Sequence, residues 1–119
     1  MGDIKLGVIE AKFADMIWQN EPVPSSQLVR LAQDALSWKK STTYTVLKRL
    51  CDRGIFQNQN GIVTACISRD AFYAAQSEQF VDETFGGSLP AFVAAFSSRK
   101  KLSEREIDQL EQLIKEMRR

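Results

Sequence analysis

The chain has 119 residues, 44% of them hydrophobic, and a formal net charge of +1. This size suits one compact domain or a small domain with an appendage, and no apolar run is long enough to cross a bilayer. Because the sequence contains no histidine, it excludes Ser-His-Asp and Cys-His catalysis and histidine-ligated zinc. It also lacks a glycine-rich loop with phosphate-binding spacing. We therefore expect neither an enzyme nor a bound metal or cofactor.

The opening segment and the two cysteines indicate a cytoplasmic protein. The segment "MGDIKLGVIEAKF" carries Asp3 and Glu10 and has no uninterrupted apolar core, so it does not predict a signal peptide. Cys51 and Cys66 form neither a Cys-x-x-Cys motif nor a disulfide framework. We expect both to be reduced and mostly buried thiols. A reactive or redox-sensing thiol is the alternative.

Apolar spacing predicts three helices in the first half of the chain. The first covers about residues 9–19, and the loop "NEPVPSS" follows it. Ser25 or Ser26 is expected to cap the second helix. The third contains "STTYTVLKRL"; either Ser41 caps it or the helix starts less sharply, and Gly54 is its expected C-terminal stop.

A β-hairpin is predicted after these helices. Residues 55–57 and 62–67 are rich in β-formers, and Asn60-Gly61 between them is a strong hairpin-turn signal. Three helices followed by a hairpin is the order of a winged helix-turn-helix, here assigned to residues 1–67. Gln59 and Asn60 belong to the polar, uncharged tip of the hairpin, the wing.

The rest of the chain, residues 68–119, is predicted to form three helices. Ser68 can cap the first, which ends at Gly86-Gly87, and the second begins near Ser88 with Pro90 in its first turn. Ser103-x-x-Glu106 is a capping box for the last helix. The predicted fold class is therefore mainly α with a small β-hairpin: a winged helix-turn-helix followed by a helical dimerisation region.

The third helix has the composition of a DNA-reading element. At 100° per residue, Thr43, Val46, Leu47, Leu50 and Cys51 fall on one side. Residues 38–53 also carry a net charge of +4, against −3 for the rest of the chain. Short hydroxyls at a helix N-terminus and cations further along suit phosphates and base edges. The candidate DNA-binding residues are Lys39, Lys40, Ser41, Thr42, Tyr44, Thr45, Lys48 and Arg49.

The second half of the chain is rich in phenylalanine, with five of the seven residues of this type. Three helices without a sheet would leave many of these rings exposed unless another surface covers them. A second copy is the expected cover, because a two-fold dimer reads two half-sites. Packing back on the winged helix is the alternative. The candidate dimerisation residues are Phe80, Phe85, Phe92, Phe96, Leu110 and Leu113.

Several of these segments together resemble the penicillinase-repressor (BlaI/MecI-type) family of bacterial winged-helix repressors. They are "STTYTVLKRLCDRGIF", the hairpin, and the long segment from "FVDETFGGSLP" to "LSEREIDQLEQLIKEM". The resemblance extends from Leu6 to Met117. It implies a homodimer that binds a dyad operator, which is double-stranded DNA, and represses transcription.

The resemblance also implies a signalling route. In such families a membrane-bound sensor protease cuts the repressor in its dimerisation region, before a phenylalanine. The matching residues are Ala95 and Phe96, although the family motif has asparagine where Ala95 stands. The C-terminal Cys-x-Cys pairs of copper-responsive relatives are absent from the ending "LIKEMRR". Lys39-Lys40 also replaces the Ser-Pro that often follows the tryptophan.

Two other classes of function stay open at the level of sequence. One is a winged helix used only for protein–protein contacts, which would leave the convergence of Lys39, Lys40, Lys48 and Arg49 without a purpose. The other is a PadR-like regulator that binds a small molecule in its helical half. An apolar pocket that dimerisation leaves open would mark that class.

Overall fold

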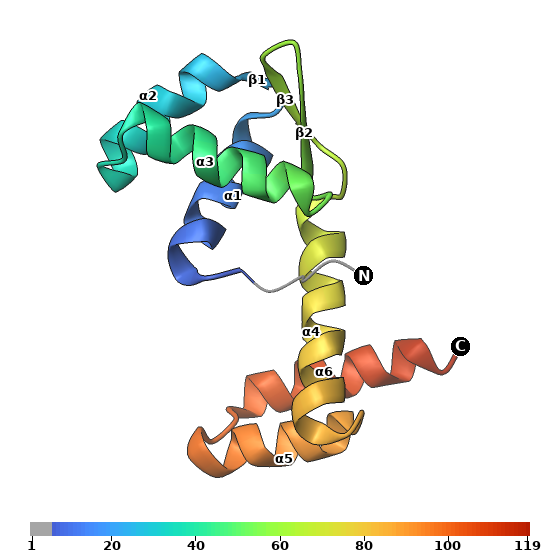
Figure 1. Ribbon diagram of the computed structural model, residues 1–119. Coiled ribbons are helices and arrows are strands. Elements are labelled where there is room, and N and C mark those ends of the chain that lie inside the picture. Colours follow the sequence, from blue (N-terminus) through green and yellow to red (C-terminus); the bar gives the residue numbers. More distant parts are fainter. Residues whose placement is uncertain (1–5) are drawn as a thin grey trace. The chain divides into compact units, whose positions relative to one another are not determined.

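A computed structural model of the chain describes residues 6–119. It divides into two compact units, one comprising the chain up to Ser77 and the other Glu78–Arg119. The element order, shown in Figure 1, confirms the predicted fold class of helices with a small antiparallel sheet. Helix α4, Arg69–Phe85, contributes residues to both units.

The first unit contains three helices that enclose an apolar core. They are α1 (Val8–Asn20), α2 (Ser25–Leu36) and α3 (Lys40–Asp52). The most deeply buried side chains of the core come from all three helices and from the sheet, and they include Phe13, Ile17, Leu28, Leu50 and Val63. The amphipathic spacing in the sequence therefore identified these helices correctly.

The sheet has three strands, one more than the predicted hairpin. The hairpin strands are β2 (Phe56–Gln59) and β3 (Ile62–Ala65), with Asn58 opposite Val63. Asn60 and Gly61 both have positive φ, at 54° and 83°, as a tight hairpin turn requires. The extra strand, β1 (Val23–Pro24), pairs with β3 through Val23 opposite Val63. Two prolines in "NEPVPSS" concealed this two-residue strand, because proline favours loops and sheet edges.

No serine side chain caps α2 or α3. Helix α2 begins at Ser25 itself, with Pro24 as its N-cap residue, and no side chain caps it. Helix α3 begins at Lys40, with Lys39 as its N-cap residue, so Ser41 lies inside the first turn. The predicted stop is correct, since Gly54 follows the helix at φ 79°, where only glycine is unstrained.

The start of α4 belongs to the core of the first unit. Phe72 is 2% exposed, and the Trp18 ring lies 5.6 Å from the Phe72 ring and 5.1 Å from the Phe56 ring. The Trp18 indole N–H also donates a hydrogen bond to the Ile67 carbonyl at 3.0 Å, and Arg69 pairs with Asp15 at 2.8 Å. These contacts join α1, the sheet and the first turns of α4.

The second unit contains the end of α4, α5 (Leu89–Arg99) and α6 (Glu104–Met117). Their predicted caps are correct: the Ser88 hydroxyl accepts from the Ala91 N–H, and Ser103 and Glu106 form the capping box. These bonds from Ser103 lower the pKa of the Glu106 carboxyl. No side chain of Glu78–Arg119 is buried. The unit consists of well-capped helices whose apolar side chains are at most partly buried.

Candidate nucleic-acid interface

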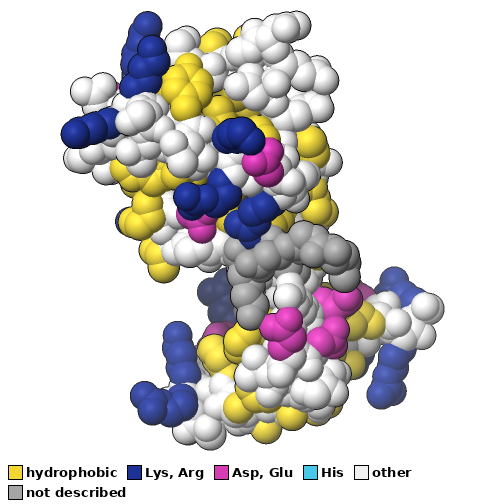
Figure 2. All heavy atoms as spheres, in the orientation of Figure 1, with side chains coloured by type: hydrophobic (Ala, Val, Ile, Leu, Met, Phe, Trp, Pro, Cys, Tyr) yellow, Lys and Arg dark blue, Asp and Glu magenta, His cyan; other side chains and the backbone are white. Residues whose placement is uncertain are grey.

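Helix α3 separates into a buried side and an outward side, as its sequence predicts. Thr43, Leu47 and Leu50 are at most 2% exposed. The residues on the outward side are exposed: Ser41, Thr42, Thr45, Lys48 and Arg49. Figure 2 shows basic side chains gathered over the part of the first unit where α3 lies, with acidic side chains among them. Burial of the apolar side fixes which side chains α3 presents to solvent.

The N-terminal end of α3 combines positive charge with unpaired backbone donors. Lys39 and Lys40 are exposed, and no side chain caps the helix. The first backbone bond of the helix runs from the Thr43 N–H to the Lys39 carbonyl, so the N–H groups of residues 40–42 lie ahead of the helical hydrogen-bond ladder. A helix end of this kind attracts anions.

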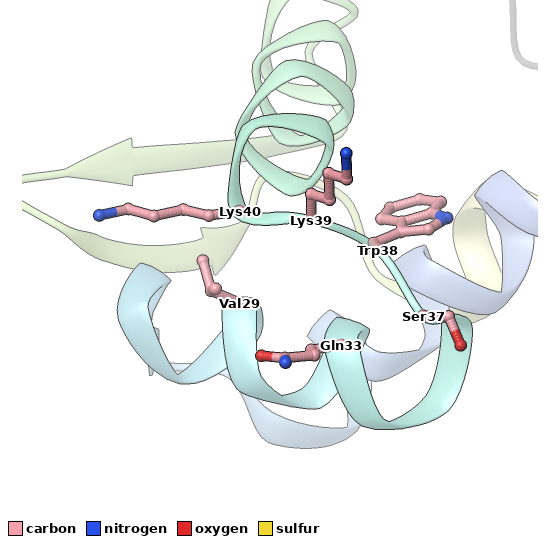
Figure 3. Close-up of a pocket in the computed structure, with 6 residues that line it drawn as sticks. All are labelled: Val29, Gln33, Ser37, Trp38, Lys39 and Lys40. Atoms are coloured by element: carbon pink, nitrogen blue, oxygen red, sulfur yellow. The ribbon is translucent and has the colours of Figure 1, made fainter.

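An open pocket of about 540 Å³ lies beside this end, between α2 and the turn into α3. Figure 3 shows Val29 and Gln33 on α2 facing it, while Lys39 and Lys40 extend from the turn in different directions. The two lysines therefore spread positive charge around the start of α3 rather than concentrating it at one point.

Ser25 connects the wing to α3. Its backbone N–H donates to the Gly61 carbonyl at 2.7 Å, and its hydroxyl lies 3.2 Å from the Tyr44 hydroxyl. Tyr44, one of the candidate DNA-binding residues, is partly buried. Ser25 was expected only as a cap, and nothing in the sequence indicated that it would hold the ring of Tyr44 and the turn of the wing.

Two of the predicted DNA-binding cations have carboxylate partners. Lys48 pairs with Asp52 at 3.0 Å, and both side chains are well exposed. Arg49 pairs at 3.3 Å with Glu10 of α1, whose side chain is 24% exposed. The spacing of four residues could have revealed the first pair. The second joins residues 39 positions apart, and only the fold brings them together.

The wing residues Gln59 and Asn60 are exposed at the tip of the hairpin. At its base the Gln57 amide donates to the Thr64 hydroxyl at 3.1 Å, and a Glu21 carboxylate oxygen accepts from the Ala65 N–H at 2.7 Å. The tip is a polar, uncharged loop, and hydrogen bonds hold the strands that carry it. It can donate to or accept from a sugar-phosphate backbone but adds little Coulombic attraction.

The predicted dimerisation residues gather in the second unit. The rings of Phe80, Phe85 and Phe92 lie 5.6–6.1 Å apart, and Phe96 follows at 6.3 Å from Phe92. Beside them an apolar groove of about 360 Å³ separates α5 from α6 and includes Leu110 and Leu113. Ala95 is exposed in the middle of α5, next to Phe96. Phe80, Phe96, Leu110 and Leu113 are exposed on the surface of the second unit, whereas Phe85 and Phe92 are partly buried.

One of the two thiols differs from the prediction. Cys66 is exposed rather than buried, because it follows β3 at the end of the hairpin. Cys51 is partly buried, and this burial, with smaller contributions from Cys66 and Asp52, raises the pKa of its thiol. A raised pKa leaves less of the reactive thiolate at neutral pH. Among residues 6–119, no group of three or more metal-binding side chains comes together.

The fold and this face define a winged helix-turn-helix protein with an added helical region. The sequence profile described as penicillinase repressor matches residues 6–116, and the chain belongs to that family of transcriptional repressors. The chain is also 22% identical over 111 residues to the penicillinase repressor of Bacillus licheniformis, covering 90% of this chain and 87% of that protein. Within residues 6–119, none of the helices is both long and apolar enough to span a bilayer.

Proposed function

We propose that the protein represses transcription by binding an operator as a homodimer, in the cytoplasm where bacterial DNA lies. Helix α3 enters the major groove of the duplex and the wing lies along the adjacent backbone. The observation that carries this proposal is the outward side of α3, where hydroxyls and cations are presented by a helix whose other side packs into the core. Membership of a repressor family supports the same assignment.

The face divides into a positioning part and a reading part. At the start of α3, Lys39, Lys40 and the uncapped backbone suit phosphates, which fix orientation without reading sequence. Ser41, Thr42 and Thr45 are short enough to let the helix approach the duplex closely. Tyr44, which Ser25 holds in place, and Arg49 reach further and can touch base edges.

The surface of the second unit supports pairing with another copy. None of the side chains of Glu78–Arg119 is buried, and Figure 2 shows hydrophobic side chains on the visible face of this unit. Phe96, Leu110 and Leu113 are 45%, 39% and 47% exposed, and they line one groove between α5 and α6. An apolar surface of this kind on a soluble protein marks an interaction site. A second copy would cover it and bring two reading helices to a dyad operator.

We also propose that proteolysis between Ala95 and Phe96, by a membrane-bound sensor protease, ends repression. Both residues lie in α5, and Ala95 is exposed. A cut here would separate Phe96 and all of α6 from the winged helix. The cut would remove side chains that line the apolar groove, and it would leave the outward side of α3 unchanged.

Removing one phosphate-binding lysine should weaken binding to every duplex alike. We expect Lys40→Ala and Lys48→Ala each to reduce the slope of log affinity against log salt by about 0.9, the contribution of one phosphate contact. The measurement is a salt titration of binding to a duplex selected from a random library and to a scrambled one. Lys101→Ala, in the loop before α6, is the matched control with the same charge change. If all three variants behave like the wild type, α3 is not the binding face.

A charge in the apolar groove should separate the dimer. Leu110→Asp would bury an unpaired carboxylate between two copies, which costs several kcal/mol. We expect the wild type to sediment as a dimer at tens of micromolar and Leu110→Asp as a monomer. Gln112→Asp, on the opposite side of α6, should leave the dimer intact. A wild type that sediments as a monomer would contradict the proposal.

Truncation after Ala95 should reproduce the effect of the proposed cut. Two linked modules bind more tightly than one by roughly 10²–10⁴-fold, so residues 1–95 should lose about that factor in operator affinity. The order of preference among duplexes should not change, because the outward side of α3 is retained. Binding of residues 1–95 and of the full chain to the same selected duplex provides the comparison. Equal affinity would show that the region after Ala95 is dispensable.

A further inference from the structure

The contact between Arg49 and Glu10 joins the proposed DNA-reading helix to the first turn of α1. An Arg49 side-chain nitrogen, Nη1, donates to Glu10 Oε2 at 3.3 Å. The arginine side chain is 55% exposed, whereas that of Glu10 is 24% exposed. Guanidinium has five N–H donors, and this contact engages one of them. Arg49 therefore keeps donors for a ligand while its position and charge are already constrained.

Glu10 is itself held at both carboxylate oxygens. Its Oε1 accepts the backbone N–H of Gly7 at 3.3 Å, at the start of α1. Because glycine has no side chain, Glu10 provides the side-chain hydrogen bond at this end of the helix. The carboxylate is thus tied to the backbone of α1 as well as to Arg49.

The neighbouring ion pair, Lys48 with Asp52, differs from the Arg49–Glu10 pair in its place in the fold and in its exposure. Lys48 and Asp52 lie one turn apart on α3 itself, and their side chains are 76% and 65% exposed. A pair of this kind contributes less than about 1 kcal/mol and exchanges readily with solvent or a phosphate. Lys48 is therefore available to any duplex, whereas Arg49 is available only to a ligand that competes with, or fits around, Glu10.

We propose that Glu10 is a specificity-determining residue of the DNA-reading face, acting as a positioning residue for Arg49. This inference rests on the function proposed above. Non-specific affinity follows the number of phosphates that free cations neutralise, and the Glu10 carboxylate offsets part of the positive charge of Arg49. At the correct site, a guanidinium that is already ordered loses less side-chain freedom on binding. Glu10 thus weakens indiscriminate binding and favours one arrangement of acceptors on the duplex.

The test is Glu10→Gln, measured as the ratio of affinities for a duplex selected by the wild type and for a scrambled duplex of equal composition. Glutamine keeps an oxygen for the Gly7 N–H but has no charge for Arg49. We expect the affinity for the scrambled duplex to rise and its slope of log affinity against log salt to steepen by about 0.9. The ratio of the affinity for the selected duplex to that for the scrambled duplex should fall roughly 5-fold. Asp52→Asn, which removes the same charge from α3, should raise both affinities alike and keep the ratio.

A double-mutant cycle with Arg49→Gln completes the test. Arg49→Gln alone should lower the ratio, and adding Glu10→Gln to it should change the ratio no further. A Glu10→Gln protein that keeps the wild-type ratio, or one whose effect persists without Arg49, would overturn this inference while leaving the proposed function intact. A wild type that prefers no duplex would instead overturn the proposed function itself.

Discussion

The burial of one side of α3 is the constraint on which the rest of the first unit depends. Leu47 and Leu50 contribute on the order of 1.5–3 kcal/mol each by leaving water, so the helix cannot rotate about its axis without losing several kcal/mol. Thr43 is buried with them, and its hydroxyl donates to the Lys39 carbonyl at 3.2 Å. The direction of every outward side chain follows from this fixed rotation.

The hydrogen bonds around α3 extend that constraint to its neighbours. Ser25 ties Tyr44 to the turn of the wing, and Glu10 ties Arg49 to α1. The proposed reading surface is therefore set by α1, α2 and the wing as well as by α3, although nearly all of its residues lie on α3. This arrangement suits recognition, because groups that are ordered beforehand lose less freedom when they bind.

The second unit differs from the first, because none of its side chains is fully buried. Its capping bonds at Ser88 and Ser103 satisfy the helix ends, but most helical stability comes from packing, and here the apolar side chains are only partly buried. A partner that covers Leu110 and Leu113 would supply the missing burial. Coupling of this kind would make folding of the region and assembly of the repressor one event, which a cut in α5 would reverse.

Local patterns in the sequence predicted most of the fold. The apolar spacing gave the helices, Asn60-Gly61 gave the turn, and the capping box gave the start of α6. The features that the sequence did not predict depend on tertiary contacts. Strand β1 exists because β3 lies beside it, and Ser25 starts α2 without capping it. The exposure of Cys66 and the pairing of Arg49 with Glu10 also depend on segments far apart in the chain.

We propose that two copies, joined by their helical units, place two α3 helices on one duplex. Hydroxyl-radical footprinting of the full chain on a selected duplex is the decisive measurement. We expect two protected clusters whose centres are separated by one helical turn, about 10–10.5 base pairs, or by a multiple of it. The clusters should be related by a dyad. A single protected patch with no dyad-related counterpart would contradict the account.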